Sequence, residues 1–145
     1  MQAEQERWLR AGIRAADVGG GVLREWQGRF SVREKSRSNL VTEADEASQA
    51  AIVTVLRSEF PEHGFLGEEN LEEGTGESEC TWIIDPLDGT TNYVHGFPYF
   101  AVSIALRVRG ELEVGVIYDP NRSETFSVVR GCGVYLNGKR VYASG

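Results

Sequence analysis

Apolar residues recur at helical spacing in the first part of the chain. Over residues 4–27 they follow the i, i+3, i+4 pattern that is typical of an amphipathic helix, at positions Trp8, Leu9, Ile13, Ala16, Leu23 and Trp26. Gly19-Gly20-Gly21 lies inside this pattern. Because glycine has a low helix propensity, we expect the triplet to weaken the middle of the helix.

A second helix is predicted to begin near Thr42. Thr42-Glu43-Ala44-Asp45 has the form of a capping box, and apolar residues then follow at helical intervals, at Ala47, Ala51, Ile52, Val55 and Leu56. Phe60-Pro61 is expected to end this helix. Before it, residues 30–35 alternate like a short strand and residues 36–39 are predicted to form a loop.

The rest of the chain carries strand patterns. Residues 70–79 are polar and glycine-containing and are predicted to form a mobile loop, and Asn137-Gly138 is a strong signal for a two-residue hairpin. Strands are predicted at residues 65–69, 82–85, 100–108, 112–118 and 125–129. Two helices followed by consecutive antiparallel strands predict one α+β domain over residues 1–145, with the helices packed on a largely antiparallel sheet.

The chain stops at Ser144-Gly145, directly after the predicted hairpin. No further helix follows that could cover the second face of the sheet. A sheet left in this way exposes strand edges and apolar surface. The pattern therefore indicates that a C-terminal partner region is absent from the chain.

Composition narrows the class of protein. The 145 residues carry 15 basic and 22 acidic side chains, a net charge of −7, which argues against nucleic acid or an anionic membrane as the main partner. Two cysteines without CxxC spacing, a polar N-terminus without secretory character and the lack of an apolar stretch of ~20 residues predict a cytoplasmic protein.

The most informative segment runs from Trp82 to Tyr93. Its apolar strand is expected to end on Asp85, where Pro86 turns the backbone so that Asp85 and Asp88 converge. The carbonyl of Leu87 can face the same point. These hard oxygen ligands favour Mg²⁺, with Mn²⁺ as a substitute. The alternative is a turn in which the aspartates only cap backbone amides.

Three further groups extend this candidate site. Glu68-Glu69 follows a strand-like segment, and one of the two side chains is expected to reach the metal; the alternative is a solvated acidic surface. Asp45 could accept a proton from water, although Thr42 and Asp45 are also explained as a helix cap. The amides of Gly89, Thr90 and Thr91 could hold a phosphate, and the hydroxyl of Thr90 or Thr91 could orient a water for attack, unless threonine is an ordinary N-cap here.

Several other chemistries are excluded by spacing. Arginine does not stand six residues after Cys80 or Cys132, where a cysteine phosphatase requires it, and the aspartates at 85 and 88 are three apart rather than the two that a phospho-aspartyl enzyme uses. The P-loop motif does not occur. With two histidines, His63 and His95, a zinc cluster is not expected.

The separate motifs together resemble the inositol monophosphatase family. The similarity lies in Leu66-Gly67-Glu68-Glu69, in the segment from Trp82 to Tyr93 with the following Val94-His95-Gly96-Phe97-Pro98, in Leu40 to Asp45 and in Asn137-Gly138. It spans nearly the whole chain. Asn39 stands where many members have aspartate, and family chains run to nearly twice this length, with a further metal-binding aspartate in their second half.

The resemblance implies both a fold and a site. The chain would be the N-terminal half of a layered α/β/α/β/α sugar-phosphatase fold. Two or three Mg²⁺ ions would be bound by Glu69, Asp85, the Leu87 carbonyl and Asp88. The catalytic residues would be Asp45, Glu69 and Thr90, and the substrate would meet Glu69, Leu87, Asp88, Gly89 and Thr90.

The family hydrolyses small phosphomonoesters, classically myo-inositol monophosphates, is inhibited by lithium and is usually dimeric. The implied partners are therefore a small phosphorylated polyol or sugar and either a second copy or a missing C-terminal half. One alternative keeps the machinery for histidinol phosphate, fructose 1,6-bisphosphate or a nucleotide 3′-phosphate. Another is a truncated, non-catalytic chain that binds Mg²⁺ weakly or docks onto another subunit.

Overall fold

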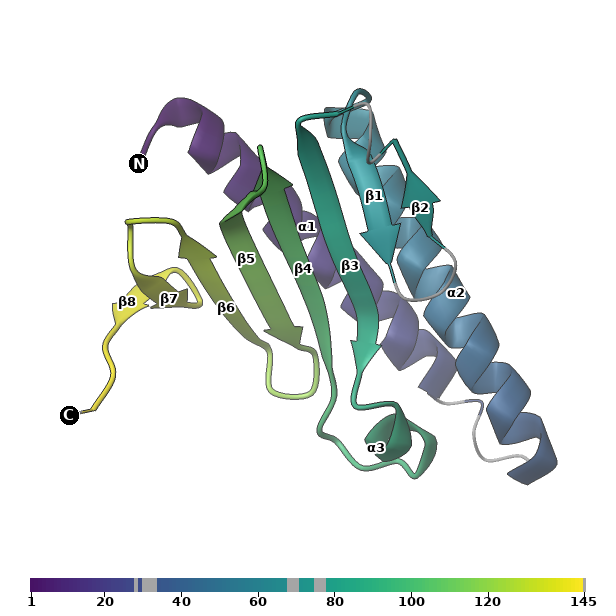
Figure 1. Ribbon diagram of the computed structural model, residues 1–145. Helices are drawn as coiled ribbons and strands as arrows, with labels where there is room; N and C mark the ends of the chain where they lie inside the picture. The colour runs from purple at the N-terminus through teal and green to yellow at the C-terminus, as the bar shows by residue number, and fades with distance from the viewer. Residues whose placement is uncertain (28, 30–33, 68–70, 75–77, 145) are drawn as a thin grey trace.

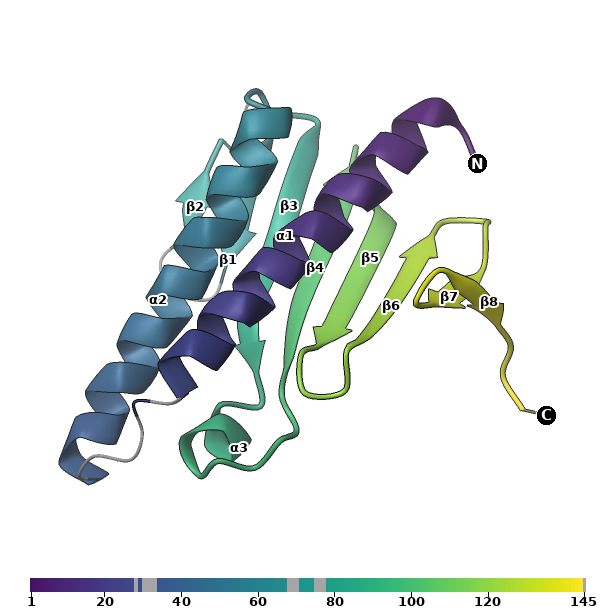
Figure 2. The ribbon, with the colours of Figure 1, turned by 180° about the vertical axis from the view of Figure 1, so that it is seen from behind.

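The computed structural model describes residues 1–27, 29, 34–67, 71–74 and 78–144, with the backbone alone for residues 34–42. Two long helices, α1 and α2, lie side by side on one face of an eight-stranded sheet, and the other face carries no helix in this part of the chain (Figures 1 and 2). The helices are α1 (Ala3–Gln27), α2 (Glu34–Glu59) and α3 (Thr90–Val94). The predicted α+β class is therefore confirmed.

The sheet has the strand order β2-β1-β3-β4-β5-β6-β7-β8. The strands are β1 (Gly64–Gly67), β2 (Glu72–Glu73), β3 (Cys80–Asp88), β4 (Ala101–Val108), β5 (Glu111–Asp119), β6 (Glu124–Val129), β7 (Val134–Leu136) and β8 (Lys139–Val141). Among the strands that the structure describes, only β1 and β3 pair in parallel, and the other neighbours are antiparallel. Asn137 and Gly138 form the predicted hairpin turn, with φ angles of 49° and 80°.

The glycines of α1 are contact points between layers. The helix runs without interruption through Gly19-Gly20-Gly21. A Cβ at Gly19 would lie 2.6 Å from Ile52 of α2, and a Cβ at Gly20 would lie 2.4 Å from the ring of Tyr118 in β5. Ser48 of α2 donates a hydrogen bond to the Gly19 carbonyl at 2.9 Å. The triplet therefore lets α1 approach both α2 and the sheet.

The predicted start of the second helix is wrong. Helix α2 begins at Glu34, eight residues before Thr42, so Thr42 and Asp45 are not at a helix cap, and Glu34 and Lys35 do not extend a strand. The physical reason is that the segment after residue 33 contains no glycine or proline before Pro61, so nothing in it stops helical growth. Residues 30–33 lie outside the described chain.

Strand β2 is absent from the predictions. It consists of two exposed glutamates, Glu72 and Glu73, which pair antiparallel with β1. Arg57 of α2 forms an ion pair with Glu73. Residues 70 and 75–77 of the predicted mobile loop lie outside the described chain. Two glutamates carry no apolar alternation, so the hydrophobic pattern could not reveal this strand.

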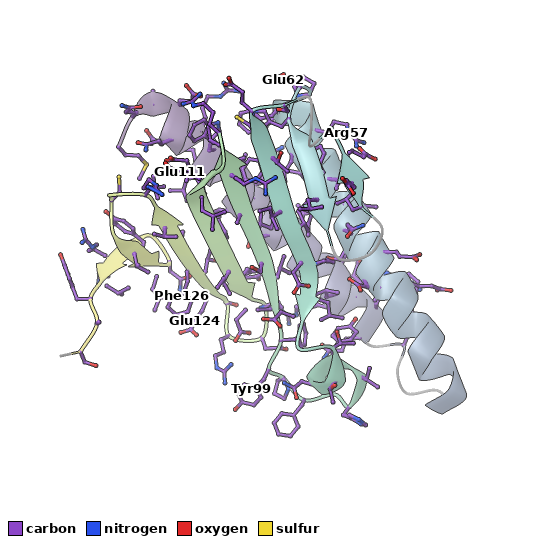
Figure 3. The ribbon with its side chains drawn as sticks, in the orientation of Figure 1. Arg57, Glu62, Tyr99, Glu111, Glu124 and Phe126 are labelled. Carbon is purple, nitrogen blue, oxygen red and sulfur yellow. The ribbon has the colours of Figure 1, made fainter. Side chains whose placement is uncertain are left out.

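The face of the sheet away from α1 and α2 is partly apolar. Ile117, Phe126, Val128 and Val134 are exposed there by 38–50% of their surfaces. Phe126 lies on β6, and Tyr99 lies at the end of the sheet where α3 packs, opposite the end that carries Glu62 and Glu111 (Figure 3). No helix in the described chain has the length and apolar character to cross a membrane.

Candidate active site

The two aspartates of the central motif lie on the same face of the sheet because β3 is bulged. Asp85 pairs with Ser103 and Asp88 pairs with Ala101, with a shift in register between them. Side chains alternate along a regular strand, so residues three apart would point to opposite faces. The extra residue in the bulge brings Asp88 back to the face of Asp85, which is the face not covered by α1 and α2.

Strand β3 does not end at Asp85, as the sequence suggested. It continues through Pro86 and Leu87 to Asp88. Proline is compatible with this course because it sits at the bulge, where a backbone N–H is not needed for the ladder. The predicted convergence of the carboxylates on one side therefore comes from a bulge within the strand rather than from a turn after it.

Asp85 is half-buried, and its Oδ1 accepts a hydrogen bond from the Leu87 amide at 3.2 Å. This contact is the one expected from the alternative interpretation, in which the aspartates only cap backbone amides. Asp85 also lines a cavity of about 380 Å³ with Leu66, Gly67, Ile83, Ile84, Ser103 and Ala105. The carboxylate therefore both fixes the bulge and borders an open space.

A hydrogen bond joins the side chain of Thr90 to the backbone of Leu87. The Leu87 side chain is buried, while its carbonyl accepts a hydrogen bond from the Thr90 hydroxyl at 3.4 Å. Gly89 precedes α3 with a φ of 97°, and it makes no side-chain cap. Thr90 is consequently the first residue of α3 and not its N-cap. A Cβ at Gly89 would lie 2.9 Å from the Tyr99 carbonyl, so glycine is required there for both its φ angle and its space.

Tyr93 attaches this short helix to the rest of the fold. It is fully buried, and its hydroxyl donates a hydrogen bond to the Leu23 carbonyl of α1 at 2.6 Å. Burial raises the pKa of the Tyr93 phenol above its ordinary value, so the hydroxyl stays protonated as a donor. The segment that carries Asp88 to Thr90 is therefore held to α1.

The remaining predicted residues come from α2 and from the chain after β1. Asp45 is half-buried on α2, next to the buried Ala44. A Cβ at Gly67 would lie 2.9 Å from the Gln49 side-chain oxygen of α2, and Gly67 pairs with Ile84, which precedes Asp85. Glu68 and Glu69 follow Gly67 directly, but they lie outside the described chain, so their predicted roles stay predictions.

The oxygen donors at this site are of the kind that a hard divalent cation binds. Asp85 and Asp88 supply carboxylates on one face, and the Leu87 carbonyl lies between them in the sequence. Within the described residues no three Asp, Glu, His or Cys side chains are grouped closely enough to hold a metal. Because Glu69 is not among these residues, the set that the sequence predicts for Mg²⁺ is described only in part.

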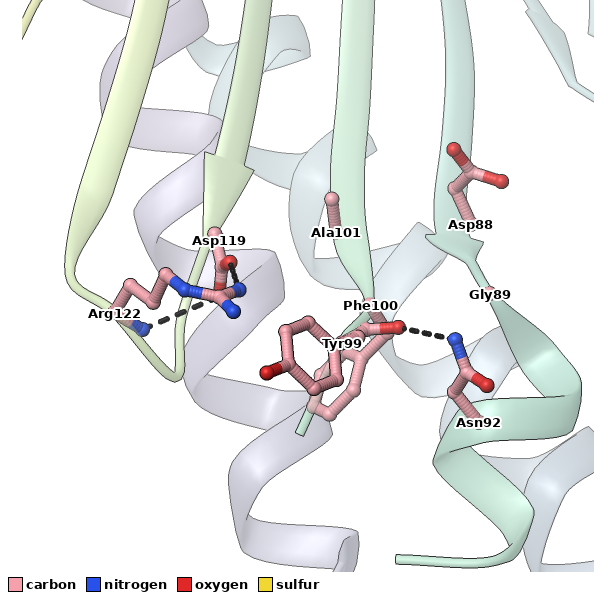
Figure 4. A pocket seen from close by; sticks show the side chains of 8 residues that line it. All are labelled: Asp88, Gly89, Asn92, Tyr99, Phe100, Ala101, Asp119 and Arg122. Carbon is pink, nitrogen blue, oxygen red and sulfur yellow. Dashed lines mark hydrogen bonds and ion pairs between the residues drawn. The ribbon is translucent and has the colours of Figure 1, made fainter. Parts of the chain in front are cut away.

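A polar pocket of about 380 Å³ opens beside Asp88 (Figure 4). Asp119 and Arg122 line its other side, with Nη1 of Arg122 donating to Oδ2 of Asp119 at 2.8 Å. The remaining lining residues are Gly89, Asn92, Tyr99, Phe100 and Ala101. Residues 119–122 lie between the strands predicted at 112–118 and 125–129, and the sequence pattern gives no sign that Asp119 and Arg122 share a pocket with Asp88.

Comparison with known proteins shows extensive similarity. The chain is 50% identical over 118 residues to the Nus factor SuhB of Pseudomonas aeruginosa, covering 80% of this chain and 44% of that protein. It is 41% identical over 140 residues to the Nus factor SuhB of Escherichia coli K12, covering 94% of this chain and 52% of that protein. The chain thus spans about half the length of these curated relatives.

Solved structures agree with the sequence comparison. An inositol monophosphatase from Anabaena (Nostoc) matches 98% of this chain and 51% of its own chain, with a TM-score of 0.85 and 38% identity. The extragenic suppressor protein suhB from Bartonella henselae matches with a TM-score of 0.83 and 38% identity, over 93% of this chain and 53% of its own. The profile of the inositol monophosphatase family matches residues 4–145, and the chain belongs to that family.

Proposed function

We propose that this chain is the N-terminal portion of a Mg²⁺-dependent phosphomonoesterase that hydrolyses a small phosphorylated polyol, most specifically a myo-inositol monophosphate. The observation that supports the proposal is the bulge in β3, which turns Asp85 and Asp88 to one face. Two adjacent carboxylates repel each other and favour a bound cation between them. Membership of the inositol monophosphatase family supports the reaction class.

Glu69, Asp85, the Leu87 carbonyl and Asp88 would hold two or three Mg²⁺ ions, or Mn²⁺ as a substitute. Bound there, the metal supplies Lewis-acid stabilisation of phosphate oxygens and a lowered pKa for water. The Asp85 carboxylate is oriented for this by the Leu87 amide. A carboxylate with one oxygen fixed by an amide loses little side-chain entropy when its other oxygen binds a cation.

Thr90 would position the attacking water. Its hydroxyl donates to the Leu87 carbonyl, so the hydroxyl oxygen can accept a hydrogen bond from a water. Asp45, with Glu69, would accept the proton that the water loses on attack. The amides of Gly89 and Thr90 would contact the substrate phosphate beside Asp88.

The choice of a myo-inositol monophosphate as the substrate rests on the family resemblance. The same machinery would also serve histidinol phosphate, fructose 1,6-bisphosphate or a nucleotide 3′-phosphate. The matched relatives are about twice as long, so the complete site is proposed to include residues of a second half, and a homodimer is the proposed assembly.

The direct test is phosphate release from myo-inositol 1-phosphate with and without Mg²⁺. The wild-type chain is compared with Asp88→Asn and with Asp17→Asn, a matched carboxylate-to-amide change on the exposed side of α1. We expect turnover that requires Mg²⁺, is lost in Asp88→Asn and is kept in Asp17→Asn. Metal-independent turnover, or an Asp88→Asn variant as active as wild type, would refute the mechanism.

A second candidate is a non-catalytic docking module, and two observations favour it. The matched relatives carry the name Nus factor, and the sheet face formed by Ile117, Phe126, Val128 and Val134 includes a pocket of about 270 Å³. Sedimentation and calorimetric titration with Mg²⁺ discriminate the two candidates. A monomer that binds one Mg²⁺ weakly and releases no phosphate favours docking.

A further inference from the structure

Ser103 lies directly across from Asp85 in the sheet. The two residues are register partners in the antiparallel pairing of β3 with β4, which run side by side in Figure 1. Partners in an antiparallel pair point to the same face, with their Cβ atoms ~4.5–5.5 Å apart. The serine oxygen is bonded to its Cβ, and the carboxylate oxygens lie one bond further out. The hydroxyl of Ser103 is therefore within hydrogen-bonding reach of the Asp85 carboxylate.

The side chains of Ser103 and Asp85 border the same space. Both residues line the cavity of about 380 Å³ described above. The other residues of its lining are a glycine and apolar residues: Leu66, Gly67, Ile83, Ile84 and Ala105. Among the residues that line this cavity, Ser103 alone has a side chain that can donate a hydrogen bond to Asp85.

The position of Ser103 is fixed by its neighbours in β4. Val102 and Ile104 are fully buried on the face of the sheet where α1 packs. Because side chains alternate along a strand, the burial of these two residues turns Ser103 to the open face. A single torsion places the serine oxygen, so a fixed serine hydroxyl loses less conformational entropy than a long polar side chain would.

Asp85 can accept this contact in addition to the one from the backbone. Its Oδ1 accepts a hydrogen bond from the Leu87 amide at 3.2 Å. An ionised carboxylate has about four lone-pair sites on its two oxygens, so it can accept an amide and a hydroxyl and still bind a cation. The amide belongs to β3 and the hydroxyl to β4. The two donors therefore hold the carboxylate from different directions.

Resting on the proposed function, in which Asp85 is a Mg²⁺ ligand, we propose that Ser103 is a positioning residue for the metal site. Its hydroxyl donates to the Asp85 carboxylate and orients the remaining lone pairs of that group toward the cation. In this assignment Ser103 touches neither the metal nor the substrate. Partners of this kind orient the ligands of many bound metals, and their loss lowers metal affinity about 10- to 100-fold.

A purely structural role for Ser103 makes a different prediction. Ser103, Ala105 and Gly115 are small residues that line the pocket of about 270 Å³ on the same face. In that role only the size of the side chain at position 103 matters. Threonine and valine have nearly the same shape, but only threonine carries a hydroxyl. Ser103→Thr and Ser103→Val therefore separate the effect of the hydroxyl from the effect of size.

The test measures the binding of MgCl₂ by isothermal titration calorimetry, which requires neither substrate nor turnover. Ser103→Thr and Ser103→Val are compared with wild type, and Asp85→Asn identifies the heat that comes from this site. Ser127→Ala is the control, because Ser127 is a buried serine of β6 that pairs with the buried Val116 and so lies on the opposite face. Circular dichroism and thermal melting without Mg²⁺ verify that each variant folds.

We expect Ser103→Val to raise the dissociation constant of Mg²⁺ about tenfold or more, and Ser103→Thr and Ser127→Ala to stay within about threefold of wild type. In phosphate release from myo-inositol 1-phosphate, Ser103→Val should need about tenfold more Mg²⁺ for half of its maximal rate, and excess Mg²⁺ should restore kcat. Equal dissociation constants for Ser103→Thr and Ser103→Val would overturn the inference, because the hydroxyl would then have no effect on the metal.

The two measurements separate failure of this inference from failure of the proposed function. Mg²⁺ binding that depends on Asp85 and on the hydroxyl at position 103, without phosphate release, supports the inference and refutes the proposed reaction. Mg²⁺-dependent phosphate release with equal Mg²⁺ affinity in Ser103→Thr and Ser103→Val keeps the function and refutes the role of Ser103. A wild type whose Mg²⁺ binding does not depend on Asp85 overturns both.

Discussion

The indole nitrogen of Trp82 donates a hydrogen bond to Nδ1 of His63 at 3.0 Å. Trp82 is fully buried in β3, three residues before Asp85. The imidazole of His63 stacks on Phe60 with ring centroids 4.5 Å apart. Because Phe60 directly follows α2, this contact joins the end of α2 to the strand that carries the candidate site. It also requires a neutral His63, since a protonated imidazole cannot accept at Nδ1.

Stability is therefore predicted to fall in mild acid. Burial lowers the pKa of His63 below its ordinary value of 6.5, an effect that Glu62 and Glu4 oppose and Arg7 reinforces. Below pH 6.5 the unfolded chain binds a proton that the folded chain resists, so the free energy of unfolding decreases as pH falls from 6.5 toward the folded-state pKa. Above pH 6.5 this contribution is constant. Urea unfolding between pH 5 and 8 measures it.

Two histidine variants make this pH test specific. His63→Gln removes the titrating group, so its unfolding free energy should lose the part of the pH dependence that His63 causes. His95→Gln, a change at an exposed position after α3, should retain the wild-type profile. At pH 8, His63→Ala should lower the free energy of unfolding by about 1–3 kcal/mol, because the buried Trp82 N–H loses its acceptor. Identical pH profiles in wild type and His63→Gln would contradict the prediction.

Two glycines in the same helix are predicted to respond oppositely to alanine. A Cβ at Gly19 would lie 2.6 Å from the buried Ile52, whereas a Cβ at Gly21 would have no neighbour within 4 Å. Gly19→Ala should lower the free energy of unfolding by about 1–3 kcal/mol through overpacking. Gly21→Ala should raise it by up to ~1 kcal/mol through helix propensity. Urea denaturation at pH 7.5 gives both values, and a stabilised Gly19→Ala would refute the close α1–α2 contact.

These glycines show what sequence patterns can and cannot predict about the fold. Alternation over residues 100–108 and the Asn137-Gly138 pair are local signals, and the structure has β4 and the β7–β8 hairpin at these positions. The effect of the glycine triplet at 19–21 was predicted from helix propensity alone, although the triplet serves the close contacts of α1 with α2 and the sheet. The start of α2 at Glu34 was missed because a good local cap at Thr42 was taken as a boundary.

The same distinction applies to the candidate site. The spacing of Asp85, Leu87 and Asp88 in the sequence predicted that they are metal ligands. This prediction requires both carboxylates on one face of the sheet, and the bulge in β3 turns them to one face. Asp119 and Arg122 could not be predicted, because their place beside Asp88 depends on the pairing of β4 with both β3 and β5. A contact across three strands leaves no mark in any one segment of the sequence.

Thr90 is predicted to affect turnover more than substrate affinity. Thr90→Val keeps the shape of the side chain but removes the hydroxyl that donates to the Leu87 carbonyl. If that hydroxyl positions the attacking water, kcat for myo-inositol 1-phosphate should fall about 100-fold with little change in KM. Thr91→Val, the same change at the exposed neighbouring position, is the control and should stay within about twofold. Equal rates for the two variants would remove Thr90 from the mechanism.

Magnesium is predicted to stabilise the folded chain through the carboxylates of β3. A ligand that binds only the folded state raises the free energy of unfolding by about 2.7 kcal/mol at 100 times its dissociation constant. Thermal melting with increasing MgCl₂ should therefore show a rising Tm in wild type, and NaCl at equal ionic strength controls for screening. Asp88→Asn removes one of the two charges that the β3 bulge turns to the same face, so its Tm should respond weakly or not at all, while Asp17→Asn should respond as wild type does. A Tm that rises equally in all three proteins would place the bound magnesium elsewhere on this acidic chain.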